Sequence, residues 1–317
     1  MLPLYLWTAV FVVSLFVLIK SSGYFTDSAE KIGLYLGIPP FIVGVTIVAV
    51  GTSLPELVSS VVAVLSGSSE IVAGNVVGSN ITNIFLIVGV SAVAGKKFRI
   101  DYELIHVDLP LFVGSAFLLA ATVWDGRFTL PEAMLSLAGF VFYTLYVTSV
   151  EKKPAGEGVK KAGDAGQGAL DRKTLALLVG SAFFIYLGAR YTVESIIRLS
   201  ELLHMGTEII AASAVALGTS LPELMVSIAA AKSGRPEMAI GNVLGSNIFN
   251  AFAVMGISAL FGTLIIPQSI LSFALPLMVA GTLLYLFITQ DRQITQWEGW
   301  MLILFYVFFI GRILNLF

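Results

Sequence analysis

The chain has 317 residues, of which 57% are hydrophobic and 12% are charged, and its formal net charge is −2. A soluble globular domain carries about 25% charged residues. The composition therefore excludes a soluble globular protein and indicates an integral membrane protein. Segments of about 20 apolar residues recur along the chain, which predicts spanning helices and not the strands of a β-barrel. Cysteine is absent, which excludes disulfide bonds, thiolate metal sites and cysteine nucleophiles.

Ten apolar segments follow one another, and each predicts a transmembrane helix. The segment that begins at Leu2 is expected to remain as a helix and not to be removed as a signal peptide, because no basic residue precedes it and no cleavage pattern follows it. The first and sixth segments are too long for an upright helix, so we expect them to tilt or to extend beyond the bilayer. The ten segments are residues 2–36, 40–66, 70–94, 103–124, 129–150, 172–203, 207–232, 237–261, 267–289 and 296–315.

Residues 151–171 are rich in Gly, Lys and Ala and hold too few apolar residues to fold, which predicts a flexible linker. The linker leaves five predicted helices in residues 1–150 and five in residues 172–317. Because five is odd, the second set must enter the membrane from the opposite side. We therefore predict an all-α membrane protein of ten transmembrane helices, built as two inverted five-helix repeats. Secondary transporters have this plan, and their substrate site lies between the repeats.

The basic residues predict the orientation of these helices. In the ten-helix plan most of them fall in four connections on one side of the membrane, and the opposite connections hold little beyond Arg127 and Arg198. Because cytoplasmic loops carry an excess of Lys and Arg, we expect the linker to be cytoplasmic and both termini to lie outside a cell membrane. The four basic connections hold Lys96, Lys97 and Arg99; Lys152, Lys153, Lys160, Lys161, Arg172 and Lys173; Lys232 and Arg235; and Arg292.

One pair of polar motifs occurs twice at the same spacing. GTSLPELVSS (51–60) and GNVVGSNITN (74–83) recur 167 residues later as GTSLPELMVS (218–227) and GNVLGSNIFN (241–250). Packing of apolar helices does not require Gly, Thr, Ser, Pro, Glu and Asn at these positions. The duplication therefore predicts a single site that is built from two halves of the chain.

Each copy places one glutamate, Glu56 or Glu223, near the centre of an apolar segment. A lone carboxylate at that depth costs several kcal/mol, about 2.5–3.5 on insertion scales. No Lys or Arg lies at matching depth in the segments that carry the motifs, so we expect the glutamates to bind a proton or a metal ion. The alternative is a protonated glutamate that only holds neighbouring helices together.

Other oxygen atoms surround these glutamates in the sequence. Pro55 and Pro222 lack an N–H, which frees the carbonyls of Gly51 and Gly218 four residues earlier. Freed carbonyls are tolerated at membrane depth where they line a cavity, and they can ligate a hard cation. Further candidate donors are the hydroxyls of Thr52, Ser53, Thr219 and Ser220, and the side chains of Ser79 and Ser246, each one helical turn before Asn83 or Asn250.

An all-oxygen ligand set suits Ca²⁺ or Na⁺ and does not suit Zn²⁺ or copper. Mg²⁺ fits the donors but resists dehydration. For the glycine pairs Gly74/Gly78 and Gly241/Gly245 we expect close helix approach. The remaining asparagines of the motifs are expected to bond neighbouring helices.

The paired GTSLPE and GN-x-x-GSN motifs resemble the α1 (51–83) and α2 (218–250) repeats of the cation/Ca²⁺ antiporter superfamily, in particular its Na⁺/Ca²⁺ exchanger branch, over nearly the whole chain. The resemblance implies alternating access in which Na⁺ influx drives Ca²⁺ extrusion. It also implies ligand roles for Glu56, Glu223, Thr52, Ser53, Thr219, Ser220, Ser79 and Ser246, and for the backbone carbonyls of Ala49 and Ala216.

Some features depart from parts of this superfamily. K⁺-dependent exchangers, and some prokaryotic ones, carry Asp where this chain has Asn250, and Asn83 matches it in the other copy. The resemblance therefore implies K⁺-independent exchange. The glutamate-bearing second motif of the H⁺/Ca²⁺ branch is absent, and the short linker lacks the large regulatory domain of animal exchangers.

Three alternatives remain beside the Na⁺/Ca²⁺ antiporter. An H⁺/Ca²⁺ antiporter could use the same glutamates to carry protons. An intramembrane serine protease would need a base near Ser53, but the two histidines, His106 and His204, lie near segment ends, so we expect no enzyme. A channel usually builds its ring of oxygens from several subunits, whereas one chain completes this site. We expect Ca²⁺, Na⁺ and the bilayer as partners, with no resident cofactor and no nucleic acid.

Overall fold

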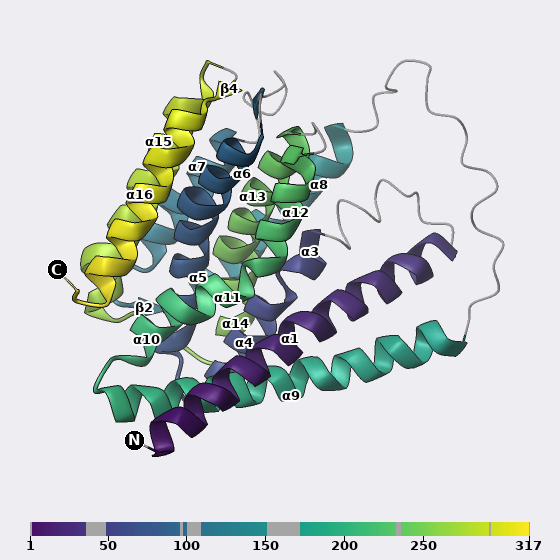
Figure 1. Cartoon of the computed structure of the whole chain (residues 1–317), viewed down its shortest axis with the longest axis vertical. Helices are drawn as coiled ribbons and strands as arrows, with labels where there is room; N and C mark the ends of the chain where they lie inside the picture. The colour runs from purple at the N-terminus through teal and green to yellow at the C-terminus, as the bar shows by residue number, and fades with distance from the viewer. Residues whose placement is uncertain are drawn as a thin grey trace.

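The structure is a computed structural model that describes residues 2–35, 49–95, 98–99, 109–150, 172–232, 236–291 and 293–316. Helices account for most of the described chain (Figure 1), which confirms the predicted all-α fold class. The predicted linker 151–171, the histidine His106 and parts of the predicted helices 40–66 and 103–124 lie outside the described residues.

The first half of the chain contains one long helix, several shorter helices and two short strands. These elements are α1 (Leu2–Tyr35), α3 (Ala49–Thr52), α4 (Leu54–Leu65), α5 (Glu70–Ile81), the π-helical turn η2 (Thr82–Ile87), α6 (Val88–Ala94), β1 (Phe98–Arg99), α7 (Leu109–Thr122), β2 (Arg127–Phe128) and α8 (Leu130–Val150).

The second half follows the same order, with α10, η4 and η6 as additional described elements. Its elements are α9 (Arg172–Leu203), α10 (Thr207–Ile210), the π-helical turn η4 (Ala211–Val215), α11 (Ala216–Thr219), α12 (Leu221–Lys232), α13 (Pro236–Phe249), η5 (Asn250–Val254), α14 (Met255–Ala259), β3 (Leu264–Ile265), η6 (Ile270–Ala274), α15 (Leu275–Thr289), β4 (Gln293–Ile294) and α16 (Gln296–Ile313).

Helices occupy all ten predicted segments, but not all of them qualify as spans by length alone. Within the described residues, five helices are long and apolar enough to cross a membrane, and the bent pair Thr207–Thr219 and Leu221–Lys232 makes a sixth. Shorter apolar helices are Leu54–Leu65, Leu109–Thr122 and Leu130–Tyr146. The count of ten spans therefore stays a prediction.

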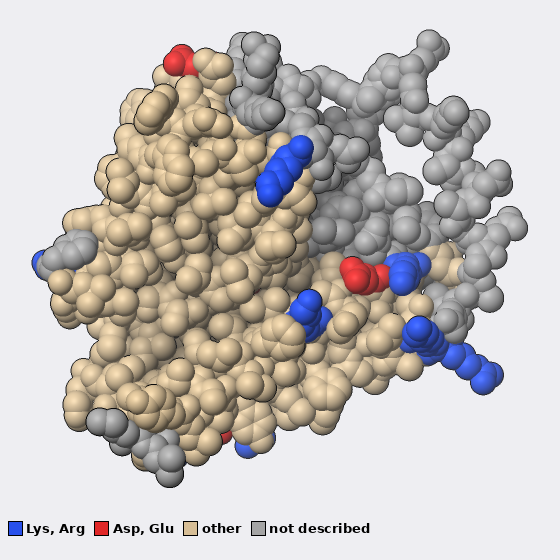
Figure 2. All heavy atoms as spheres, in the orientation of Figure 1, with Lys and Arg blue, Asp and Glu red and all other residues tan. Residues whose placement is uncertain are grey.

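The outer surface is apolar and the interior holds polar groups, as a lipid environment requires. Figure 2 shows few charged side chains on the visible face. Large apolar residues such as Phe16 (59% exposed) and Phe142 (72% exposed) face outwards, whereas many serines, threonines and asparagines of the motifs are buried. The protein is therefore a multi-pass membrane protein whose interior holds polar side chains.

Helices α1 and α9 lie side by side and antiparallel (Figure 1). The Thr192 hydroxyl donates to Ser14 Oγ at 3.0 Å, and Gly188 lies against the backbone of Leu18. The residue numbers of the contacts increase along α1 while they decrease along α9, so the two helices run in opposite directions. Because α1 and α9 open the two halves of the chain, this direction is consistent with the predicted inverted repeats.

Each strand of the first half pairs with a strand of the second half. Strand β1 pairs with β4, with Phe98 opposite Ile294, and β2 pairs with β3, with Arg127 opposite Ile265. Both antiparallel ladders thus join one half to the other. Phe98 and Ile265 are 167 positions apart, as are Arg127 and Ile294. This is the spacing of the repeated motifs, so β1 is equivalent to β3 and β2 is equivalent to β4.

Close backbone contact joins α5 of the first motif to α10 and η4, the segment that precedes the second motif. A Cβ at Gly78 would overlap the Ala212 carbonyl oxygen, and one at Gly74 would overlap that of Glu208. This confirms the predicted close approach for the first glycine pair. Gly241 and Gly245 have no comparably close neighbour in the described part of the chain, so the same prediction is not supported there.

Candidate cation site

A break in each motif helix brings the glutamates to the centre of the fold. Ser53 (φ −94°, ψ 11°) separates α3 from α4, and Ser220 (φ −81°, ψ 5°) separates α11 from α12. The second break bends its helix pair by 42°. Pro55 and Pro222 stand two residues later and supply no N–H to the preceding turn. The sequence Ser-Leu-Pro-Glu therefore ends one helix and starts the next with a glutamate in its first turn.

The two glutamates are held by serines from the opposite half of the chain. The Ser53 hydroxyl donates to Glu223 Oε1 at 2.9 Å, and the Ser220 hydroxyl donates to Glu56 Oε1 at 3.4 Å. Both carboxylates are 1% exposed. Among the described residues neither has a Lys or Arg partner. The duplicated motifs thus meet at one buried acidic centre.

Other predicted residues surround this pair. Thr219 and Ser79 lie within interaction range of the Glu56 carboxylate, and Thr52 lies within range of that of Glu223. The Thr219 hydroxyl also donates to the Val215 carbonyl at 3.0 Å.

The two predicted backbone ligands differ in how much of their surroundings is described. Ala216 is buried, and its carbonyl accepts from the Ser220 N–H at 3.1 Å. The Thr219 hydroxyl lies 3.5 Å from the same oxygen as a second, longer donor. Ala49 is the first residue of α3.

Eight buried side-chain oxygens of the two motifs have no hydrogen-bond partner among the described residues. Six of them form three pairs at equivalent positions, which are Oε2 of Glu56 and Glu223, Oγ of Ser79 and Ser246, and Oδ1 of Asn83 and Asn250; the other two are Oδ1 of Asn75 and Asn247. Buried polar atoms in proteins are nearly always paired. Unpaired acceptors at the same positions in both halves are therefore available to coordinate a cation.

Three of the four remaining asparagines, Asn75, Asn80 and Asn242, bond to other helices as expected, whereas Asn247 Nδ2 donates to Val243 in its own helix at 2.8 Å. Asn75 Nδ2 donates to the Glu56 carbonyl at 3.2 Å, and Asn242 Nδ2 donates to the Glu223 carbonyl at 3.2 Å. Asn80 has a contact that the sequence did not predict, because its Oδ1 accepts from Asn250 Nδ2 at 3.1 Å. The motif pattern separates Asn83 and Asn250 from the other asparagines, but it does not indicate that Asn80 contacts Asn250.

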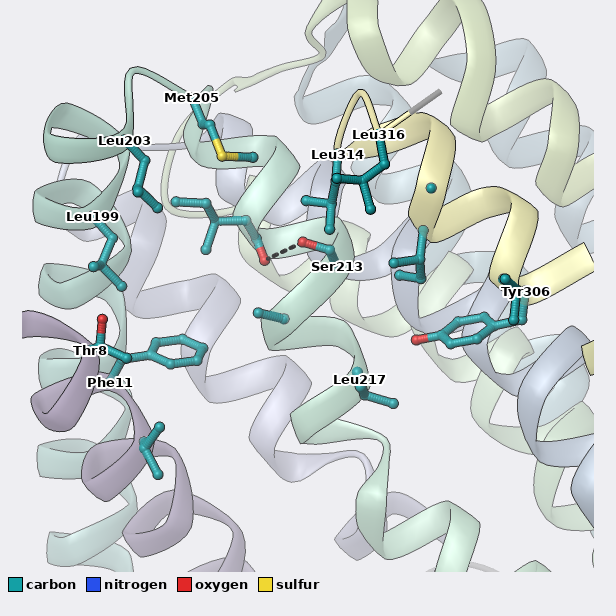
Figure 3. Close-up of a pocket in the computed structure, with 16 residues that line it drawn as sticks. Thr8, Phe11, Leu199, Leu203, Met205, Ser213, Leu217, Tyr306, Leu314 and Leu316 are labelled. Carbon is teal, nitrogen blue, oxygen red and sulfur yellow. Dashed lines mark hydrogen bonds between the residues drawn. The ribbon is translucent and has the colours of Figure 1, made fainter. Parts of the chain in front are cut away.

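An apolar cavity is a separate feature. It has a volume of about 730 Å³ and lies between α1, α9, the α10–α11 segment and α16 (Figure 3). Leu199, Leu217 and Tyr306 line it, and its polar lining is small: the Ser213 hydroxyl bonds back to its own helix. None of the predicted ligands lines this cavity, so it is separate from the predicted cation site.

The serine protease alternative receives no support from the arrangement of these residues. Ser53 donates its hydroxyl to a carboxylate of the other motif, and His204 is an exposed residue just after α9. Within the described residues no histidine approaches Ser53 as a base would have to.

Comparison with known proteins gives one consistent result. The family model described as "Sodium/calcium exchanger protein" matches residues 6–149 and 173–314. The sodium/calcium exchanger MaX1 of Methanosarcina acetivorans is 36% identical over 95% of this chain and 96% of its own length. The inner membrane protein YrbG of Escherichia coli is 30% identical over 80% of this chain and 79% of its own length.

Solved structures agree with the sequence matches. A structure of the sodium-calcium exchanger NCX_Mj, soaked with Na⁺ and Sr²⁺, superposes with a TM-score of 0.67 and 28% identity over 97% of this chain and 99% of that one. The named exchanger relatives are transporters and not enzymes. The prediction that the chain is not an enzyme is thereby confirmed.

Proposed function

Because the chain belongs to the sodium/calcium exchanger family, we propose that it is a Na⁺/Ca²⁺ antiporter that extrudes Ca²⁺ in exchange for Na⁺ by alternating access. The observation that carries the proposal is the buried pair Glu56 and Glu223, each bound by a serine of the other half. Two carboxylates match the charge of one Ca²⁺, or they share their charge among several Na⁺ ions.

The proposed ligands are all oxygen donors. The two carboxylates are joined by hydroxyls, amide oxygens and backbone carbonyls, which together suit a hard cation that loses its water shell. The complete proposed set is Glu56, Glu223, Thr52, Thr219, Ser53, Ser220, Asn83, Asn250, Ser79 and Ser246, with the backbone carbonyls of Ala49 and Ala216.

Exchange follows from the cost of an empty site. Two buried carboxylates without a counter-ion are strongly unfavourable, so the protein rearranges readily only when Ca²⁺ or Na⁺ neutralises them. Release of one ion on one side then requires binding of the other. The competing function is H⁺/Ca²⁺ exchange, in which protons neutralise the same two side chains.

Potassium independence, orientation and subunit requirement are part of the proposal. Asn83 and Asn250 supply amides where K⁺-dependent exchangers carry an Asp in one copy, which leaves two carboxylates at the site. The basic connections favour a cytoplasmic linker and extracellular termini. Both motifs lie in one chain, so one subunit is sufficient for transport, and no resident cofactor is required.

The test is ⁴⁵Ca²⁺ flux in proteoliposomes of the purified protein. A Na⁺ gradient at fixed pH should drive Ca²⁺ uptake, and added K⁺ should not change the rate. Uptake that follows an H⁺ gradient and ignores Na⁺ would establish the competing function instead. A rate that requires K⁺ would contradict only the K⁺-independent part of the proposal.

A further inference from the structure

Asn80 connects the two halves of the chain directly behind the proposed ligand Asn250. Its Nδ2 donates to the backbone carbonyl of Asn247 at 3.4 Å, and its Oδ1 accepts from Asn250 Nδ2 at 3.1 Å. Asn80 lies in α5 of the first half, and both of its partners lie in the second half. All three side chains are at most 3% exposed, so water does not compete for these bonds.

The hydrogen-bond partners determine how the side-chain amides of Asn80 and Asn250 are oriented. A backbone carbonyl can only accept, so the nitrogen of Asn80 must face Asn247. The Oδ1 of Asn80 therefore faces Asn250, and this oxygen can only accept a hydrogen bond. Asn250 must turn its nitrogen towards Asn80, which turns its Oδ1 away. This Oδ1 is buried and has no hydrogen-bond partner among the described residues.

The equivalent bonds are not made in the other half. The residue that corresponds to Asn80 is Asn247, and its Nδ2 donates to Val243 in its own helix at 2.8 Å. Its Oδ1 has no partner among the described residues, so it does not accept from Asn83, the counterpart of Asn250. Helix packing alone would treat the equivalent asparagines alike, whereas this contact is specific to Asn250.

We infer that Asn80 is a positioning residue, which orients the amide of Asn250 so that its oxygen and not its nitrogen faces the transported cation. The inference rests on the proposed function and deepens it. An amide presents an oxygen on one side and two N–H donors on the other, and the donors repel a cation. An aspartate presents an oxygen in either orientation and needs no such neighbour. Asn80 thus supplies the hydrogen-bond acceptor that holds the amide at position 250 with its oxygen towards the cation.

The experiment is a double-mutant cycle on equilibrium ⁴⁵Ca²⁺ binding to the purified full chain in detergent. Asn80→Ala should weaken Ca²⁺ binding by about 10-fold or more, as the loss of an outer-shell partner commonly does. In the Asn250→Asp background, Asn80→Ala should change affinity by no more than about twofold, the scatter expected between uncoupled sites. Each background is measured against its own parent, so the added charge of the aspartate cancels.

Asn75→Ala is the matched control, since Asn75 also bonds across helices but through the Glu56 carbonyl. Its effect should be the same in both backgrounds. If Asn80→Ala fails to fold by size-exclusion chromatography, Asn80→Ser is compared in the same two backgrounds.

Two results overturn the inference. Equal losses from the Asn80 substitution in both backgrounds would make Asn80 merely structural, and unchanged affinity would remove its role altogether. A wild-type protein whose bound Ca²⁺ is not displaced by Na⁺ would instead contradict the proposed function, and the inference would fall with it.

Discussion

The Ser53 hydroxyl reaches across the fold and donates to Glu223 Oε1 at 2.9 Å, although 170 residues separate the two in sequence. The reciprocal bond from Ser220 to Glu56 is longer, at 3.4 Å. The two halves of the site are therefore alike in composition and unequal in geometry. In an inverted-repeat transporter the two halves exchange their roles as the site opens to one side and then to the other. Unequal bonds at equivalent positions are consistent with such a cycle.

The difference between these two bonds predicts unequal effects of serine removal. A hydrogen bond to a charged group contributes about 1.5–3 kcal/mol, so Ser53→Ala should reduce the Na⁺-driven Ca²⁺ uptake rate about 10-fold or more. Ser220→Ala should have a smaller effect, because its bond is longer. Ser66→Ala is the control, as Ser66 is an exposed residue after α4. Equal losses from both site variants would show that the bond lengths do not reflect their strengths.

Removal of a carboxylate charge should separate transport from stability. Glu56→Gln and Glu223→Gln should each abolish Na⁺-driven ⁴⁵Ca²⁺ uptake, because one remaining carboxylate cannot neutralise Ca²⁺. The same variants should raise the melting temperature of the cation-free protein, since an unpaired buried charge is costly, and should lose the increase in Tm that Ca²⁺ gives the wild type. Glu201→Gln, on an exposed side chain, should behave as the wild type. Uptake that survives both substitutions would eliminate these glutamates as ligands.

Close contact at Gly78 predicts a stability defect. An added methyl group there would overlap the Ala212 backbone, and overpacking typically costs about 1–3 kcal/mol. Gly78→Ala should lower the Tm in detergent, and any folded fraction should show weaker Ca²⁺ binding, because the contact holds the first motif against the segment that leads into the second. Gly180→Ala in α9 is the control, since its site has no described neighbour within 4 Å. Matching melting curves for the two variants would contradict the packing argument.

The composition of the site could be predicted from sequence, because Glu56 and Glu223 are polar residues that an apolar segment has no structural reason to keep. The duplication at a constant spacing also predicted that the two copies meet. Which serine binds which glutamate could not be predicted. That pairing depends on the break angle at Ser53 and Ser220 and on how closely α5 approaches η4, and both are tertiary properties.

The separate roles of the asparagines were also beyond the sequence. Asn75 and Asn80 are five residues apart in one motif, and periodicity gives no reason to assign one to the Glu56 carbonyl and the other to Asn250. The strand pairs between the two halves are two residues long, which is too short for an alternating pattern to be recognised. Each strand pairs with a strand of the other half, and the local sequence does not indicate so distant a partner.

The natural absence of cysteine makes the predicted orientation directly testable. A single cysteine at Leu316, which is 70% exposed near the end of the chain, should react in intact cells with a membrane-impermeant maleimide. A single cysteine at Lys160 in the linker should react only after the membrane is permeabilised, because the basic connections favour the cytoplasmic side. The unmodified chain provides a background without signal. Labelling of the linker cysteine in intact cells would reverse the orientation and, with it, the side from which the protein takes up Ca²⁺.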